Sequence, residues 1–175
     1  MMQKNDKQFF SLWFIGPSAS GKSTISDKIF KILKKNKKNL VYLDGDHARK
    51  IFINESGYDP VSRSKNITKY MNVVSWLNSF GISVIVAAIN AFEKDRSTCR
   101  RKLENYKEVY LKCSIDERIK RDKKKLYLPA LSGEKKHVVD VDIPFDKPIN
   151  ADLTIDTENF SPDEIVKKVL KDLKL

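Results

Sequence analysis

The sequence predicts a single α/β domain in which a parallel sheet is flanked by helices. Short apolar runs alternate along the chain with segments of helical periodicity, which is the pattern of parallel α/β proteins. The 175 residues suffice for one domain, and no repeat or low-complexity segment divides them. A glycine-rich stretch separates the first apolar run from the first helical segment. We therefore expect one domain over residues 1–175.

Each expected element follows from its own pattern. The expected strands are short apolar runs, at 9–15, 40–43, 82–88, 108–113 and 152–155. The expected helices have amphipathic spacing, at 22–35, about 63–80, about 93–104, 115–122 and 162–173. The last helix has a strong start, because Ser161 can cap it, Pro162 suits its first position and Glu164 can complete a capping box.

The periodicity is lost between Asp122 and Asp152, where prolines, a glycine and lysines dominate. A long loop without regular structure in a compact domain usually has a function. We expect a basic lid over about 122–148 that closes over phosphate groups. A mobile surface loop is the alternative for the same segment.

The composition is strongly basic, with 34 Lys and Arg against 23 Asp and Glu and a formal net charge of +11. Most lysines lie on predicted helices, without an interleaved aromatic and basic module. A solvated surface that attracts anionic nucleotides is therefore favoured over a nucleic-acid platform. No apolar stretch could span a membrane, and residues 1–8 lack the apolar core of a signal peptide. We expect a cytoplasmic protein without a membrane partner, in which Cys99 and Cys113 are reduced.

The residues after the first predicted strand fit the pattern G-x-x-x-x-G-K-[ST]. This context predicts a phosphate-binding loop and a P-loop NTPase fold, in which the backbone curls round phosphate oxygens. Lys22 would reach the β and γ phosphates, and the Ser23 hydroxyl would ligate Mg²⁺. An ordinary glycine-rich turn with an exposed lysine is the alternative. The expected phosphate-binding residues are Gly16, Ser18, Ala19, Ser20, Gly21, Lys22, Ser23 and Thr24.

The second predicted strand ends in Asp44-Gly45-Asp46. Ligands of open parallel sheets bind beyond the carboxyl ends of the strands, so these carboxylates should lie near the phosphate loop. Asp46 could accept a proton from an attacking hydroxyl or help to hold Mg²⁺. The alternative is a turn in which one carboxylate caps a helix over 48–53. The third strand ends without an acidic residue, which favours a small-molecule kinase over a motor or switch ATPase.

Basic side chains near these carboxylates predict an anionic acceptor substrate. Arg49 lies one helical turn beyond Asp46, and Arg63 and Asn66 share a helix face. Arginines in these positions could form bidentate hydrogen bonds with an anion. Arg96 and Arg100 form a further pair at helical spacing. Each arginine could alternatively be a surface charge.

Taken in order, these residues resemble the adenylyl-sulfate kinase family over about 9–157. The motifs are the phosphate loop, Leu43-Asp44-Gly45-Asp46 with Arg49, Arg63 with Asn66-Ile67, Phe92 with Arg96, Lys124 with Leu126-Tyr127, Gly133-Glu134, and Asp142 with Pro144 and Pro148. The resemblance implies a kinase that uses ATP and Mg²⁺ to phosphorylate the ribose 3′-hydroxyl of a nucleotide. It also implies a homodimer.

The resemblance assigns roles to individual residues. Asp46 would be the catalytic base beside Lys22, Ser23 and Asp46 would hold the metal, and Arg121 would contact ATP. The 122–148 segment would be the lid. The acceptor would be bound by Asp44, Arg49, Tyr58, Arg63, Asn66, Ile89, Asn90, Lys124, Leu126 and Val138.

The departures from the family lie around the acceptor. Where the family has Phe-Thr-Gly-Ile-Asp, with an aromatic ring that stacks on adenine, this chain has residues 138–142, Val-Val-Asp-Val-Asp. Leu128-Pro129 replaces a basic pair, and Asn90-Ala91 replaces Ser-Pro. Tyr58 would supply the one remaining aromatic face for stacking on the base. Loss of one stacking face would remove about 1–3 kcal/mol of base-stacking free energy. A loss of that size is enough to change which base is preferred.

These departures predict the same reaction on a different nucleotide. The features resemble cytidine diphosphoramidate kinases, which serve capsule phosphoramidate biosynthesis, because a smaller pyrimidine needs less stacking surface. Cytidine diphosphoramidate is therefore the first candidate acceptor and adenylyl sulfate the second. A nucleotide-dependent regulator or nucleic-acid binder without catalysis is the alternative from another class.

Overall fold

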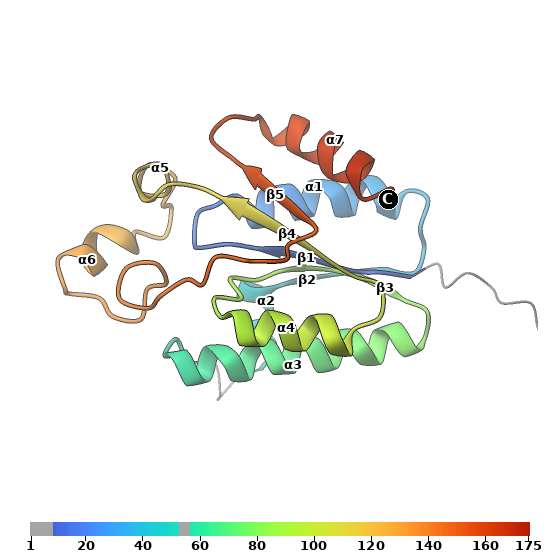
Figure 1. The fold of residues 1–175 in the computed structure, drawn as a ribbon, viewed down its shortest axis with the longest axis horizontal. Coiled ribbons are helices and arrows are strands. Elements are labelled where there is room, and N and C mark those ends of the chain that lie inside the picture. Colours follow the sequence, from blue (N-terminus) through green and yellow to red (C-terminus); the bar gives the residue numbers. More distant parts are fainter. Residues whose placement is uncertain (1–8, 53–56) are drawn as a thin grey trace, which may run out of the picture.

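The computed structural model describes residues 9–52 and 57–175. One sheet of five parallel strands crosses the molecule in the order β2-β3-β1-β4-β5 (Figure 1). The predicted five-stranded parallel sheet is thereby confirmed, and each strand end lies within two residues of its expected place. The strands are β1 Ser11–Ile15, β2 Leu40–Asp44, β3 Ser83–Ala87, β4 Tyr106–Lys112 and β5 Leu153–Asp156.

Helices cover both faces of this sheet. In Figure 1, α1 and α7 lie above the sheet, α3 and α4 lie below it, and α5 and α6 extend beyond the carboxyl end of β4. The helices are α1 Lys22–Lys34, α2 Gly45–Ile51, α3 Pro60–Ser79, α4 Glu93–Lys102, α5 Ile115–Lys120, α6 Tyr127–Leu131 and α7 Pro162–Asp172.

Strand β1 divides the core into two layers, because successive side chains of a strand point to opposite faces. Trp13 and Ile15 pack with the helices α2, α3 and α4. Leu12 and Phe14 pack with α1 and α7. All four side chains are fully buried, so β1 lies in the middle of the sheet with both faces covered.

Two helix starts show how local sequence sets an element's boundary. Helix α7 begins with the predicted capping box between Ser161 and Glu164. Helix α3 begins three residues before its expected start, because Asp59 caps it and Pro60 takes the first helical position. The Asp59 carboxylate accepts a hydrogen bond of 2.9 Å from the N–H of Ser62.

Helix α6 lies inside the segment that the sequence predicts to be without regular structure. Pro129 is its third residue, where a missing N–H costs no intrahelical hydrogen bond. The Asp122 carboxylate accepts hydrogen bonds from the N–H groups of Leu126 and Tyr127, at 2.5 and 2.8 Å. A capped helical turn therefore begins the expected lid, and the expectation of an entirely irregular segment was wrong there.

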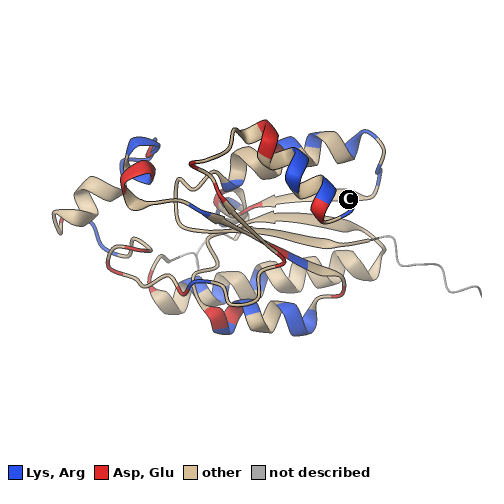
Figure 2. Cartoon of the chain, turned by 45° about the horizontal axis from the view of Figure 1, so that its top comes forward, with Lys and Arg blue, Asp and Glu red and all other residues tan. Residues whose placement is uncertain are grey.

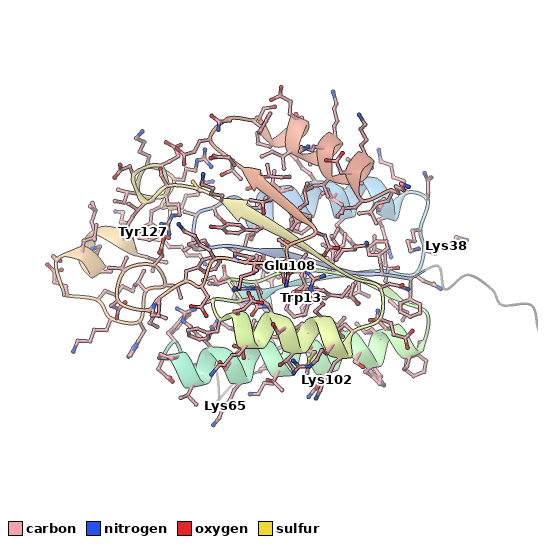
Figure 3. The ribbon with its side chains drawn as sticks, viewed as in Figure 1. Trp13, Lys38, Lys65, Lys102, Glu108 and Tyr127 are labelled. Carbon is pink, nitrogen blue, oxygen red and sulfur yellow. The ribbon has the colours of Figure 1, made fainter. Side chains whose placement is uncertain are left out.

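Lysines and arginines are spread over helices on both faces of the sheet and over α5, with acidic side chains among them (Figure 2). In Figure 3, Lys65 and Lys102 point away from the body of the molecule. None of the helices in the described part of the chain is long and apolar enough to cross a membrane. Cys99 and Cys113 are buried free thiols, and burial raises the pKa of Cys99 to about 12.

Arg96 and Arg100 do not form the substrate-facing pair that their spacing suggests. Arg96 is buried, pairs with Glu93 at 2.7 Å, and donates to the carbonyl oxygens of Asn90 and Asp146 at 2.8 and 2.6 Å. Arg100 pairs with Asp152 at 3.1 Å. Arg96 therefore fastens the end of the 122–148 segment to α4, and Arg100 fastens the chain just after it.

Replacement of Arg96 by alanine should lower the free energy of unfolding by about 2–4 kcal/mol, because the buried carbonyl of Asn90 and the carbonyl of Asp146 both lose their donor. Urea unfolding followed by circular dichroism measures this change. Arg101→Ala is the matched control on the same helix, because Arg101 is exposed, and it should change stability by less than about 0.5 kcal/mol. Equal unfolding midpoints for the two variants would contradict the role of Arg96.

Candidate active site

A cavity of about 630 Å³ opens at the carboxyl ends of the central strands. It is lined by the phosphate loop, the end of β2, α3, the turn after β3 and the 122–148 segment. Of the predicted site residues, Gly16 and Ser20 lie outside the lining. The others all line it: Ser18, Ala19, Gly21, Lys22, Ser23, Thr24, Asp44, Asp46, Arg49, Tyr58, Arg63, Asn66, Ile89, Asn90, Arg121, Lys124, Leu126 and Val138.

Gly16 and Ser20 support the loop from behind. A Cβ on Gly16 would lie 2.7 Å from the carbonyl oxygen of Leu111 and 2.8 Å from the Ser20 hydroxyl. The backbone φ of Gly16 is 143°, and its N–H donates to the carbonyl of Ile89 at 3.4 Å. Only glycine allows this close approach, so the first glycine of the motif fixes the loop against two neighbouring strands.

Lys22 brings a buried cation to the floor of the cavity. Its ammonium donates to the Pro17 carbonyl at 2.6 Å. Burial lowers the pKa of Lys22 to about 7, although Asp46 and Asp44 act in the opposite direction. An anion bound in the loop would compensate for the lost hydration and favour the charged form.

The Ser23 hydroxyl donates to the Asp44 carboxylate at 2.7 Å. Asp44 also accepts from the Asp46 N–H at 2.9 Å, which caps α2, and from the Tyr42 hydroxyl at 3.2 Å. Burial acts to raise the pKa of Asp44, but these hydrogen bonds outweigh it and the pKa lies below its usual value. The capping alternative for the Asp-Gly-Asp turn is therefore realised, with Asp44 as the cap.

Asp46 extends from α2 into the opening of the cavity and forms an ion pair with Lys124 of the lid. Both side chains are more than half exposed. Ser23 is thus paired with Asp44, and the expected metal pair of Ser23 with Asp46 stays a prediction. Among the described residues, no group of three or more His, Cys, Asp or Glu side chains could hold a metal by itself. Mg²⁺ with phosphate ligands and waters needs only one or two carboxylates.

The opposite end of the cavity is rich in unpaired donors. Arg63 donates through Nη2 to the His137 carbonyl at 2.8 Å, while its Nε and the Nδ2 of Asn66 have no partner in the described structure. Burial and the neighbouring Arg49 lower the pKa of Arg63 to about 10. The Arg49 guanidinium lies over the Tyr58 ring, 4.4 Å from its centroid. This arrangement suits an anion beside an aromatic surface.

The departures at residues 138–142 have two different structural outcomes. Val138 lines the cavity and packs with Tyr127 and Ala130 of the lid. Asp140 has φ of 68°, a conformation that glycine adopts without strain, and its carboxylate pairs with the buried Arg118 at 2.5 Å. The acidic residue therefore keeps the glycine-like turn and fastens it to α5.

Sequence reasoning missed the residues that anchor the lid. Tyr127 is fully buried, and its hydroxyl donates to the carbonyl of Ser18 in the phosphate loop at 2.8 Å. Arg118 donates to the same hydroxyl at 2.8 Å. Figure 3 shows Tyr127 in the lid region at the left of the molecule. An aromatic residue within an otherwise polar, proline-containing segment was the available signal.

Arg121 lines the cavity from the end of α5, with its guanidinium held in place by other residues. Its Nε donates to Glu117 at 2.9 Å, and its two terminal nitrogens donate to the hydroxyl and carbonyl of Thr157 at 3.1 Å each. Lysines from the lid add to the charge around the opening, namely Lys123, Lys124, Lys135 and Lys136. The segment predicted to be a basic lid therefore borders the cavity, and its closing over phosphate groups stays a prediction.

The chain is similar to known nucleotide kinases throughout its length. The family model described as adenylylsulphate kinase matches residues 8–156. A cytidine diphosphoramidate kinase of Campylobacter jejuni is 40% identical, with 95% of this chain and 97% of that protein covered. An adenylyl-sulfate kinase of Staphylococcus epidermidis is 36% identical, with 98% and 87% covered.

A solved structure agrees with these sequence relationships. The APS kinase CysC of Mycobacterium tuberculosis, in complex with AMPPNP and APS, superposes with a TM-score of 0.88 at 29% identity, covering 95% of this chain and 98% of that one. The P-loop NTPase fold is thereby confirmed. This chain belongs to the adenylylsulphate kinase family and is a nucleotide kinase.

Proposed function

We propose that the protein transfers the γ-phosphoryl group of ATP to the ribose 3′-hydroxyl of cytidine diphosphoramidate. The observation that carries this proposal is one cavity whose lining includes both the phosphate-loop residues Lys22 and Ser23 and the donors Arg63 and Asn66. Asp46 lines the same cavity. The 40% identity to a cytidine diphosphoramidate kinase supports the choice of acceptor.

The donor end fits ATP and Mg²⁺. The close approach at Gly16 and the buried ammonium of Lys22 both suit phosphate oxygens. Ser23 and the ionised Asp44, with Asp46 nearby, would hold Mg²⁺ and its water molecules. When bound, Mg²⁺ neutralises negative charge that develops on the phosphates during transfer.

The acceptor end fits a nucleotide with an anionic tail. Arg49, Arg63 and Asn66 would bind the tail, and Tyr58 and Val138 would form the walls of a small base site. Asp46 would accept the proton of the attacking hydroxyl, and its ion pair with Lys124 would place the lid over the reacting groups. A homodimer, a cytoplasmic location and a role in capsule phosphoramidate biosynthesis belong to the same proposal.

Lys22 should take up a proton when ATP binds at pH 8. The unbound side chain, with a pKa of about 7, is mostly neutral at that pH, and the phosphates favour its charged form. Calorimetric titrations in two buffers with different ionisation enthalpies should show an uptake approaching one proton at pH 8 and almost none at pH 6. Lys22→Met should abolish the difference, while Lys31→Met, on the exposed side of α1, should retain it. Equal uptake at both pH values in the natural protein would refute this assignment.

Asp46→Asn should lower kcat by roughly 10²–10⁴-fold, because the amide cannot accept the proton of the acceptor hydroxyl. Unfolding stability should change little, because the Asp46 side chain is 57% exposed. Asp163→Asn is the matched control, because Asp163 is also an exposed aspartate paired with a lysine, Lys28 at 2.8 Å. Near-normal turnover in the Asp46 variant would rule out the role as base.

Adenylyl sulfate is the second candidate acceptor, supported by the 36% identity to an adenylyl-sulfate kinase. A coupled assay of ADP release should give a higher kcat/KM with cytidine diphosphoramidate than with adenylyl sulfate at the same ATP and Mg²⁺ concentrations. Faster turnover of adenylyl sulfate would reverse the order of the two candidate acceptors but leave the assignment as a kinase unchanged. No ADP release with either acceptor, together with tight salt-sensitive oligonucleotide binding, would favour the non-catalytic alternative.

A further inference from the structure

Three residues that line the cavity carry buried polar atoms without a partner among the described residues. They are three donors, Arg63 Nε, Asn66 Nδ2 and Asn90 Nδ2, and one acceptor, Asn90 Oδ1. The side chains are almost wholly removed from solvent, with residues 9%, 2% and 2% exposed respectively. Buried polar atoms in folded proteins normally have partners, so a bound ligand should supply them. That ligand must offer oxygen acceptors and, to Asn90, one hydrogen-bond donor.

Asn90 is held firmly in this position. Its carbonyl accepts a hydrogen bond of 2.8 Å from the buried Arg96, and the carbonyl of Ile89 before it accepts from Gly16 of the phosphate loop. An amide group offers an NH₂ donor and an oxygen acceptor whichever way it is turned. The backbone of Asn90 is thus held at the cavity lining, and its side chain carries both a donor and an acceptor there.

A backbone requirement alone does not account for Asn90. Its φ of 40° is a conformation that asparagine tolerates better than most residues. Asn105 has a similar φ of 50°, but its amide donates to the Phe9 carbonyl at 3.1 Å and lies outside the cavity. Asn90 differs in lining the ligand cavity, and both polar atoms of its amide are buried without a partner among the described residues.

The two candidate acceptors differ in what their anionic ends offer. A terminal sulfate, like a terminal phosphate at neutral pH, presents oxygen acceptors alone. A phosphoramidate presents oxygen acceptors and an N–H donor on the same phosphorus atom. Arg63 and Asn66 can donate to the oxygens of either group, but within the anionic tail only the amine of the phosphoramidate can donate to the unpaired oxygen of Asn90.

We infer that Asn90 selects the terminal group of the acceptor, accepting a hydrogen bond from the P–NH₂ nitrogen and donating one to a phosphoryl oxygen. This inference rests on the proposed nucleotide 3′-kinase function and adds a residue that distinguishes amine from oxygen at the tail. An acceptor with oxygen in place of the amine would leave the Asn90 oxygen buried and unpaired and bring a further negative charge beside it.

The test uses cytidine and adenosine diphosphates, each with either oxygen or NH₂ at the terminal phosphorus. For the natural protein, kcat/KM and calorimetric affinity should favour the amine by about tenfold or more. Asn90→Gly retains the positive φ and removes the amide. The preference for the amine should then fall below about threefold. The ratio of kcat/KM for the cytidine compounds to that for the adenosine compounds should stay unchanged. Asn105→Gly, the matched control, should retain the preference.

Asn90→Asp provides a second variant that keeps the acceptor oxygen and the backbone conformation. It should bind all four compounds more weakly yet still favour the amine, because its carboxylate accepts from N–H and repels a terminal oxyanion. Equal affinity of the natural protein for amine and oxygen would overturn the inference. A preserved amine preference in Asn90→Gly, or a change in base preference instead, would overturn it as well. A different result would show that cytidine diphosphoramidate is not the preferred acceptor. That result is faster turnover of adenylyl sulfate by the natural protein.

Discussion

The close approach of the chain at Gly16 is the constraint on which the site depends. Strand β1 lies between β3 and β4, and Gly16 ends it where the Leu111 carbonyl from β4 leaves no room for a side chain. The Gly16 N–H is meanwhile bonded to Ile89 beyond β3. One residue without a side chain thus joins the phosphate loop to the turn that carries Asn90. A side chain there would push the loop away from the Leu111 carbonyl and displace the Ser20 hydroxyl.

The 122–148 segment, the predicted lid, is attached to this same loop through buried contacts. Tyr127 bonds the loop carbonyl of Ser18, and Ala19 packs against the small apolar cluster of the lid. Arg118 connects Tyr127 with Asp140, so both ends of the lid meet at one buried cation. Removing Arg118 from water is costly, and its hydrogen bonds to a hydroxyl, a carboxylate and the Ser114 carbonyl compensate for that cost. The position of the lid is therefore coupled to that of the loop.

The fold could be predicted because its signals are local. Apolar runs, the glycine motif and the capping box at Ser161 each act within a few residues, and the sheet followed from them. Helix α6 was missed because Pro129 resembles a helix breaker unless its place in the first turn is known. The pairing of Ser23 with Asp44 and the buried role of Arg96 depend on residues distant in sequence, which spacing alone cannot reveal.

The substitutions that distinguish this chain from the family motifs do not all have the same structural effect. Asp140 stands where the family has glycine, yet it keeps a positive φ and gains an ion pair, so that substitution acts on the lid. Asn90 stands where the motif of the resembled family has serine; it lines the cavity, and its amide oxygen is buried without a partner among the described residues. A serine hydroxyl can donate to an oxyanion, whereas an amide can donate and accept at two separate atoms. The two substitutions therefore lie in different places: Asp140 acts on the 122–148 segment, whereas Asn90 belongs to the lining of the cavity.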